Sequence, residues 1–290
     1  MRIKKEVRKI VASVLAFLMV VSLIPVNSLM TKANAASKTT FEGGKTVEDG
    51  TWKGWTWNVF GSSTDVTKAF ATDTGNGGVT LEVTGDKGKI NGSASDQGLN
   101  TFLYELDKSY DFTITAQAKV DTLAANAQAA FGLTIRDNVG AHGNTAKLTA
   151  DKNNFAFVGG YGNQAASGHG NAGYKTTALA HTRLGESPEV GGTYDLAIQK
   201  VGDSVKLYFN GEVAAECSAD DLITDNAMYV GLFAARNAKV TFNNVKLAYT
   251  QDSSSVKVTT NVTAPKKTTY CAGNTYEDVD LTGFKATVSV

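Results

Sequence analysis

The sequence predicts an all-β protein in which two antiparallel sheets pack face to face as a sandwich. Several runs alternate apolar and polar side chains with a period of two, and Gly, Asn, Asp and Ser fill the segments between them. No long segment carries the apolar spacing of an amphipathic helix. Many short strands joined by polar turns, without a layer of helices, indicate a two-sheet sandwich, which we place at residues 36–250.

The clearest strand spans residues 112–120, where apolar and polar side chains alternate without interruption. The same pattern recurs at 131–136, 194–198, 205–209, 230–232 and 240–249. Each of these strands is expected to turn one face to the core and the other to water. Thr134 and Arg136 are therefore expected on a solvated face, opposite the core.

Two hairpins and one helical turn are expected in the second half of this domain. Gly202-Asp203 and Asn210-Gly211 each separate two alternating runs, and Asn-Gly is the preferred pair for a type I′ hairpin turn. Ser218 is expected to cap a single helical turn that runs to Ile223.

The first 35 residues have the pattern of a secretory signal peptide. Residues 2–9 are strongly basic, an apolar run extends from Ile10 to about Val26, and Ala33-Asn34-Ala35 offers a cleavage site. This apolar run is shorter than the roughly 20 residues that a membrane-spanning helix needs. The sequence therefore predicts an exported Gram-positive bacterial protein, secreted or held at the cell surface, without membrane contact after cleavage.

Charge argues against a nucleic-acid partner. The whole chain has 28 basic and 28 acidic residues, but the predicted signal peptide holds six of the basic residues and one of the acidic residues. The mature chain keeps 22 basic and 27 acidic residues, which gives a net charge of −5. Nucleic-acid binding needs concentrated positive charge, whereas an anionic glycan needs only a few local Arg or Lys side chains.

A polar linker and the start of a second β unit follow the sandwich. The linker covers residues 251–261, and residues 262–290 begin a unit that stops in the middle of an alternating strand. We therefore expect further domains beyond Val290. Cys217 and Cys271 fall in different units and lack a CxxC spacing, so no disulfide is expected between them, although export would permit one.

Three stretches carry a resemblance to a known family. They are residues 110–116 with 131–137, residues 194–196 with 205–211, and residues 229–238 with 240–245. Together they resemble the concanavalin-like, laminin-G-type jelly-roll modules that accompany secreted polysaccharide-degrading enzymes. The FGLTIRD and VGLFAARNA segments are most similar to the accessory module of bacterial pectate lyases. The resemblance covers about residues 100–248 and implies a jelly-roll sandwich whose partner is a polysaccharide.

Residues 262–290 resemble the first strands of a bacterial Ig-like repeat, through Pro265–Tyr270, Gly273 and Asp280–Phe284. Such repeats act as spacers in surface and secreted proteins. The resemblance implies an incomplete Ig-like β unit, and it places any catalytic domain of the parent protein beyond Val290.

The sequence lacks the catalytic motifs known on this fold. A glycosidase needs two carboxylates that face each other across the scissile bond, and the E-x-D-x-E pattern of laminarinase-type enzymes is absent. The Q-I-H segment of jelly-roll alginate lyases is also missing, as are the nucleophile-elbow, metalloprotease and phosphate-loop motifs. We therefore predict no catalytic residue in this chain, and a hydrolase or lyase within the sandwich is the least favoured interpretation.

Aromatic side chains are candidates for glycan contact because sugar rings stack on aromatic faces. Trp55 and Trp57 share one face if residues 52–57 form a strand, with Trp52 on the other face. They would form a sugar platform or, in the second interpretation, seal the sandwich core. Tyr161 and Tyr174 lie in a Gly- and Asn-rich stretch that is expected to form loops, and loops often carry function.

Three polar side chains complete the predicted ligand-binding set. Arg136 and Arg236 follow apolar strands and would bind a uronate carboxylate through a bidentate fork, unless they hold a neighbouring loop instead. His169 is a candidate contact in a loop, the alternative being a solvated histidine without a ligand. No cofactor is expected. Asp137-Asn138 and residues 151–154 offer oxygen ligands for a structural Ca²⁺, but their spacing is not diagnostic of a metal.

The leading hypothesis is a non-catalytic carbohydrate-binding module of an extracellular polysaccharide-degrading enzyme. Its expected target is pectin or another plant cell-wall glycan, and its parent would be a polysaccharide lyase such as a pectate lyase. The alternative is a structural or adhesive segment of a secreted or surface protein, in which sandwich and Ig-like units extend a stalk.

Overall fold

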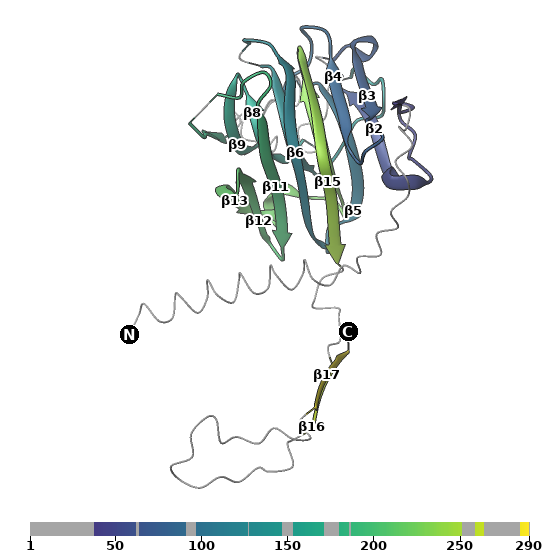
Figure 1. The fold of residues 1–290 in the computed structure, drawn as a ribbon, viewed down its shortest axis with the longest axis vertical. Helices are drawn as coiled ribbons and strands as arrows, with labels where there is room; N and C mark the ends of the chain where they lie inside the picture. Colours follow the sequence, from purple (N-terminus) through teal and green to yellow (C-terminus); the bar gives the residue numbers. More distant parts are fainter. Residues whose placement is uncertain are drawn as a thin grey trace. The chain divides into compact units, whose positions relative to one another are not determined.

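Alternating strands build two antiparallel sheets that face each other across a shared core (Figure 1). The computed structural model describes residues 38–61, 64–90, 97–126, 128–146, 153–170, 180–185, 187–250, 259–263 and 285–289. The predicted signal peptide, Tyr174 and Cys271 lie outside these residues. The predicted all-β antiparallel sandwich is confirmed.

The first sheet contains eight strands, and all of its neighbouring strands are antiparallel. In spatial order they are β1 (Thr39–Thr40), β3 (Ala69–Asp73), β4 (Val79–Val83), β15 (Ala238–Thr250), β6 (Asp111–Leu123), β11 (Thr193–Val201), β12 (Ser204–Phe209) and β13 (Glu212–Ser218).

The second sheet contains seven strands, again antiparallel throughout. In spatial order they are β10 (Ala180–Arg183), β9 (Gln164–Gly170), β8 (Phe155–Tyr161), β7 (Ala130–Arg136), β14 (Ala227–Ala235), β5 (Leu99–Asp107) and β2 (Trp55–Phe60).

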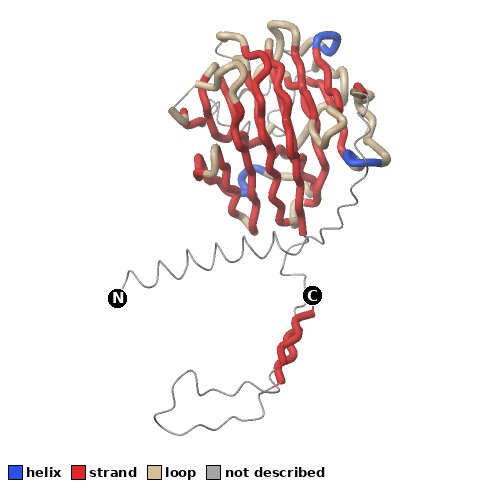
Figure 2. The backbone as a smooth tube through the Cα atoms, viewed as in Figure 1, coloured by secondary structure: helices blue, strands red, loops and turns tan. Residues whose placement is uncertain are grey.

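Helical structure is limited to short turns in the described residues (Figure 2). These turns are η1 (Gly50–Trp52), η2 (Val66–Lys68) and α2 (Ala219–Leu222). No described helix has the length and apolar character that crossing a membrane requires. After the sandwich, β16 (Thr259–Thr263) and β17 (Lys285–Ser289) form an antiparallel pair, and the Ig-like nature of this unit stays a prediction.

The predicted turns lie where the sequence places them. Gly202-Asp203 joins β11 to β12, and Asn210-Gly211 joins β12 to β13 with positive φ angles of 49° and 84°, as a type I′ turn requires. Ser218 caps α2, because its side chain accepts a hydrogen bond from the backbone N–H of Asp221 at 3.1 Å.

The inner faces of the two sheets form the main core. On β6 the side chains alternate between buried and partly exposed, as predicted. Fully buried apolar side chains come from both sheets, among them Ile114, Leu133, Leu232 and Phe242. Burying each such side chain contributes about 1.5–3 kcal/mol relative to leaving it exposed.

Asn100 connects the two sheets within this core. Its side-chain amide donates to the backbone carbonyls of Phe70 on β3 at 2.8 Å and Glu82 on β4 at 3.1 Å. Its Oδ1 accepts a hydrogen bond from Nε1 of Trp57 at 2.7 Å. These bonds satisfy polar groups whose burial would otherwise be unfavourable, so the indole of Trp57 is part of the link between the sheets.

Candidate functional site

The outer face of the seven-stranded sheet is concave. β2 and β8 are separated in this sheet by β7, β14 and β5, so in a flat sheet they would lie roughly 19 Å apart. Phe60 of β2 and Phe155 of β8 nevertheless place their rings 5.5 and 5.1 Å from the same Arg136 guanidinium. These contacts bring side chains of distant strands together over the outer face, as a sheet that curves around this face would do.

One part of this concave face, here called the covered half, is filled by a second apolar cluster. It consists of Arg136 of β7 and the buried side chains of Phe60, Ile90, Leu99, Phe155, Phe157 and Phe233. Every residue of β7 is buried as a result. The expectation that Thr134 and Arg136 lie on a solvated face is wrong, because both faces of this strand are covered.

Arg136 is fully buried and holds its surroundings together. Its Nη2 donates to Gln97 Oε1 at 3.0 Å and Asn153 Oδ1 at 2.8 Å, and its Nε donates to the carbonyl of Asn138 at 3.1 Å. Burial lowers the pKa of Arg136 to about 10, so it stays charged at neutral pH. Burial also raises the pKa of Asp137 to about 6, although the nearby Arg136 opposes this rise. A buried charge of this kind depends on its partners.

The loop Asn138–Asn144 crosses the concave face from β7 to β2 and forms the boundary of the covered half. At Gly140 a Cβ atom would lie 2.8 Å from Cβ of Phe60, so only glycine permits this close approach. Gly143 donates from its backbone N–H to the carbonyl of Val59 at 2.8 Å, and Nδ1 of His142 accepts from the N–H of Val59 at 3.3 Å. These bonds anchor the loop on the edge strand β2.

Beside the loop Asn138–Asn144, here called the crossing loop, lies a cleft of about 390 Å³, here called the open cleft. Its floor comes from outward-facing residues of β2, β5 and β14, and its rim comes from the crossing loop and Gly44. The lining residues are Gly44, Thr56, Asn58, Leu103, Glu105, Val139, Gly140, Ala141, His142 and Tyr229. This floor is mainly polar with one aromatic ring, that of Tyr229, because Leu103 is only 2% exposed.

The polar groups of the open cleft differ in how far the protein already uses them. Tyr229 is hydrogen-bonded to the exposed carboxylate of Glu105. Burial is the main cause that raises the pKa of Tyr229, and the negative charge of Glu105 is the next. Tyr229 is therefore a neutral phenol at physiological pH. Thr56 shares a hydrogen bond with Thr46 at 2.9 Å. Within the described residues no side-chain hydrogen bond engages the amide of Asn58, which is free to donate and accept.

His142 is neutral in the folded protein. Burial lowers its pKa, while its hydrogen bond to the backbone of Trp57 opposes this effect. One ring nitrogen accepts from Val59, and the ring lies 4.8 Å from that of Trp57 in an edge-to-face arrangement. The imidazole therefore fixes the rim of the open cleft rather than adding a charge to it.

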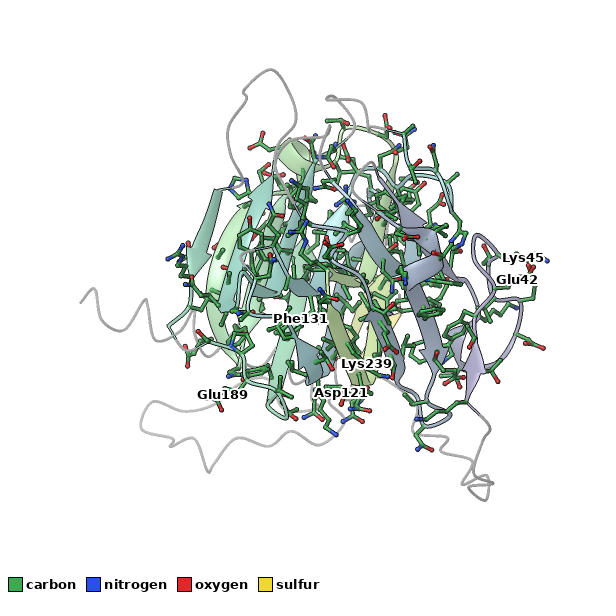
Figure 3. The ribbon with its side chains drawn as sticks, turned by 90° about the horizontal axis from the view of Figure 1, so that it is seen from above. Glu42, Lys45, Asp121, Phe131, Glu189 and Lys239 are labelled. Atoms are coloured by element: carbon green, nitrogen blue, oxygen red, sulfur yellow. The ribbon has the colours of Figure 1, made fainter. Side chains whose placement is uncertain are left out.

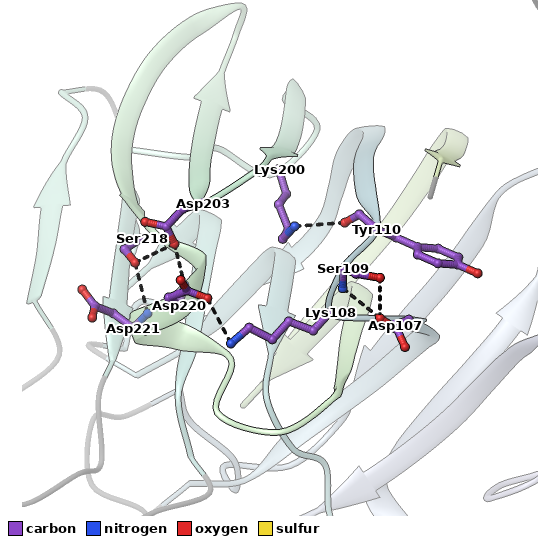
Figure 4. Close-up of polar contacts among 9 residues, drawn as sticks. All are labelled: Asp107, Lys108, Ser109, Tyr110, Lys200, Asp203, Ser218, Asp220 and Asp221. Atoms are coloured by element: carbon purple, nitrogen blue, oxygen red, sulfur yellow. Dashed lines mark hydrogen bonds and ion pairs between the residues drawn. The ribbon is translucent and has the colours of Figure 1, made fainter. Parts of the chain in front are cut away.

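A second pocket, of about 410 Å³, lies among the turns at one end of the sandwich. Figure 4 shows that its polar side chains contact one another. Asp203 accepts from Oγ of Ser218 at 2.8 Å and from the N–H of Asp220 at 2.7 Å, and Lys108 pairs with Asp220 at 3.0 Å. The buried Lys200 donates to the carbonyl of Tyr110 at 3.1 Å. These contacts hold α2 against the turns, so the pocket is built mainly by structural bonds.

The tryptophans predicted as a sugar platform lie inside the protein. Trp55 and Trp57 are 5% and 8% exposed and belong to the main core. The ring of Trp55 stacks on Phe102 at 5.2 Å, and Trp52 packs edge-on against Trp55 at 5.7 Å. The platform prediction is wrong because these faces are already covered. The interpretation that the rings seal the sandwich is correct, and Trp52 joins them because residues 50–52 form a helical turn.

The two arginines do not meet at a ligand site. Arg136 is buried beneath the crossing loop, which removes its guanidinium from any bound sugar. Arg236 lies at the turn between β14 and β15, at the other end of β14 from Tyr229. Its Nε donates to the carbonyl of Gly88 at 3.2 Å and its Nη1 to Asn126 at 3.4 Å. Both side chains hold loops, the second of the two interpretations drawn from the sequence.

The remaining predicted contacts are spread over the seven-stranded sheet. Tyr161 is half-buried against Phe157 at the end of β8, with its ring 6.1 Å away, and burial raises its pKa. His169 lies within β9 rather than in a loop, opposite Ala156. Their contact with a ligand stays a prediction, and Tyr174 falls outside the described residues.

Of the two aspartates in the segments proposed for a calcium site, Asp151 lies outside the described residues and Asp137 is used inside the protein. Its Oδ1 accepts from the backbone N–H of Asn154 at 3.0 Å, and its Oδ2 accepts from Thr224 at 3.4 Å. Among the described residues, no group of three or more His, Cys, Asp or Glu side chains is arranged to hold a metal. Cys217 is half-buried, and burial raises the pKa of its thiol to about 12.

Sequence reasoning missed the residues that line the open cleft. The alternation that places Trp55 and Trp57 on one face of β2 places Thr56 and Asn58 on the opposite face. Glu105 and Tyr229 occupy the same outward face and are partners in the register of β5 and β14. The signal was present in the sequence, but the aromatic face was favoured over the polar one.

Comparisons with known proteins give one related sequence and several distant folds. No protein-family model matches the chain. It is 29% identical over 235 residues to pectate lyase L of Thermoclostridium stercorarium, covering 80% of this chain but only 18% of that protein's length. Among solved structures it is similar to a carbohydrate-binding module from Bacillus subtilis, with 17% identity, a TM-score of 0.38, and coverage of 74% of this chain and 96% of that one. It is also similar to an alginate lyase of polysaccharide lyase family 7, with 14% identity, a TM-score of 0.40, and coverage of 63% and 82%.

Proposed function

We propose that this chain is a non-catalytic carbohydrate-binding module of an exported polysaccharide-degrading enzyme, and that the open cleft holds the glycan. The observation that carries the proposal is the composition of the open cleft. Tyr229 offers a half-exposed aromatic ring, and the free amide of Asn58 and the carboxylate of Glu105 offer hydrogen bonds to hydroxyls. This combination matches the chemistry of a sugar ring, which has apolar C–H faces and a polar edge.

A binding role without catalysis is supported by the groups that line the open cleft. Glycoside hydrolysis uses two carboxylates on opposite sides of the scissile bond, and Glu105 is the one carboxylate among the described lining residues. A lyase acting on a uronate must stabilise negative charge that develops on the substrate. The described lining residues include no Lys or Arg for that task.

The parent protein is proposed to degrade a plant cell-wall polymer such as pectin. The support is the 29% identity to pectate lyase L, which this chain matches over less than a fifth of that protein's length. The catalytic domain would then belong to another part of the parent protein. Export is supported by the basic, apolar and small-residue order of residues 1–35.

Affinity electrophoresis tests the proposed function. The purified protein is run through native gels that contain homogalacturonan, rhamnogalacturonan, xylan, arabinan, galactan or soluble cellulose. We expect at least one polymer to retard the protein, and Tyr229→Ala to reduce the retardation. Tyr208→Ala is the matched control, because Tyr208 is a half-exposed tyrosine on the eight-stranded sheet. Free migration in every gel would favour a structural or adhesive segment instead.

A further inference from the structure

We infer that the open cleft selects an uncharged stretch of glycan and rejects uronate residues. The module would then hold its parent enzyme on a neutral polymer, even where the polymer that the parent cleaves is acidic. This inference rests on the proposed function and names the class of ligand for the same cleft.

The first argument is the charge of the open cleft. Glu105 is the one ionised group among its described lining residues, since Tyr229 is a neutral phenol and His142 a neutral imidazole. Glu105 is exposed and lies on the floor strand β5. A uronate carboxylate bound here would meet a like charge, and like charges placed together in an interface suppress binding of the wrong partner.

The second argument concerns two basic side chains that are close to the lining residues in strand register or in sequence, and that are paired with other groups. Arg136 lies one strand beyond Tyr229 in the sheet register, but it is fully buried and bonded to Gln97, Asn153 and Asn138. Lys45 follows the lining residue Gly44 in sequence, and its ammonium pairs with Glu42 at 2.6 Å on the outer edge of the molecule (Figure 3). The guanidinium of Arg136 is therefore inaccessible to a uronate, and the exposed ammonium of Lys45 already has a carboxylate partner.

The third argument is that the polar groups present are suited to hydroxyls. A carboxylate accepts hydrogen bonds and cannot donate them, so the free lone pairs of Glu105 fit the O–H groups of a neutral sugar. The amide of Asn58 both donates and accepts, as a hydroxyl does. A uronate carboxylate only accepts hydrogen bonds, so it cannot pair with the acceptor Glu105 on this floor as a hydroxyl can.

Calorimetric titration of the purified protein with defined oligosaccharides tests the inference. The probes are neutral hexasaccharides of xylan, arabinan, galactan and cellulose, and a hexasaccharide of galacturonic acid, each with calcium and with EDTA. We expect one neutral series to bind at least about tenfold more tightly than the galacturonic acid hexasaccharide.

The variant Glu105→Gln makes the test specific to this cleft. Removing the charge should weaken neutral binding and strengthen uronate binding, so the ratio between the two affinities falls several-fold. Glu212→Gln is the control, because Glu212 is an exposed carboxylate on β13 of the other sheet, and it should leave the ratio unchanged.

The outcomes separate the inference from the proposed function. Binding of the galacturonic acid hexasaccharide as tight as that of every neutral one, with or without calcium, overturns the inference and leaves the carbohydrate-binding role intact. An unchanged ratio in Glu105→Gln also overturns it. Binding of no oligosaccharide overturns the proposed function, and the inference with it.

Discussion

The covered half and the open cleft belong to the same concave sheet, yet buried apolar side chains fill only the covered half. In the covered half, Phe60 and Phe155 enclose the guanidinium of Arg136, and the loop Asn138–Asn144 covers it. In the open cleft, Asn58 and Glu105 face outward, and the same loop forms only the rim. One half therefore stabilises the sheet, and the other half is the proposed glycan site. Substitutions in the two halves should separate stability from binding.

Arg136→Met should have the largest effect, on stability alone. The substitution leaves Gln97 and Asn153 without their buried donor and Asp137 without its nearby cation. Breaking a buried, paired charge costs about 3–5 kcal/mol of unfolding free energy, which urea denaturation measures. Lys206→Met, on the exposed face of β12, should change it by less than about 0.5 kcal/mol. A loss below about 1 kcal/mol in Arg136→Met would show that the covered half is not held by this side chain.

Trp57→Phe should have the next largest effect, again without a change in glycan retention. It removes the donor to Oδ1 of Asn100 in the buried link between the sheets. An unsatisfied buried acceptor costs about 1–3 kcal/mol, which a thermal melt measures. Reduced glycan retention by the folded variant would instead restore Trp57 to the binding surface.

Asn58→Ala should weaken binding and leave stability nearly unchanged. Its amide makes no side-chain hydrogen bond within the described residues, so no protein contact is lost. One hydrogen bond to a hydroxyl contributes about 0.5–1.5 kcal/mol, which corresponds to roughly a threefold to tenfold loss of affinity. Asn76→Ala, in an exposed turn of the other sheet, is the control. Equal affinities for the two variants would place the glycan elsewhere.

Acid should loosen the rim of the open cleft. The folded state keeps His142 neutral with a lowered pKa, so its stabilising effect is complete above the unfolded pKa of about 6.5 and is lost as pH falls through the folded pKa. Protonated His142 no longer accepts from the N–H of Val59. The protection factor of the Val59 amide, which is the intrinsic exchange rate divided by the observed rate at the same pH, should therefore be lower at pH 5 than at pH 7.5.

Two features make this acid response specific. His142→Phe should remove the pH dependence, and a variant that keeps it would show that another group is responsible. Global stability would not report on His142 alone, because the titration of Asp137 changes stability in the opposite direction. Its pKa is raised to about 6 by burial, so its protonation between about pH 6 and 3.8 favours the folded state.

The sequence predicts the strands and turns well because these features are local. Period-two alternation identifies β6 and its faces, Asn210-Gly211 supplies the two positive φ angles of its turn, and Ser218 caps α2. These elements depend on neighbours within a few residues. Their physical causes can be found in the sequence alone.

The site is harder to predict because it depends on what covers each face. Alternation shows that Thr134 and Arg136 share a face, but not that a later loop and side chains from other strands of the same sheet bury that face. Alternation also places Trp57 and Asn58 on opposite faces of β2. It does not show which of these two side chains points toward the other sheet. The sheet curvature and the path of the Asn138–Asn144 loop decide both questions, and they arise from contacts between distant segments.

The central claim, that the open cleft is the glycan site, is tested most directly by a hydrogen–deuterium exchange footprint. The protein is compared alone and with the polysaccharide that retards it most in native gels. We predict slower exchange in β2, in β5 around Glu105 and in the loop Asn138–Asn144, with no change at Asp203 and α2. Protection confined to the pocket beside α2, or to the outer face of the eight-stranded sheet, would contradict the claim.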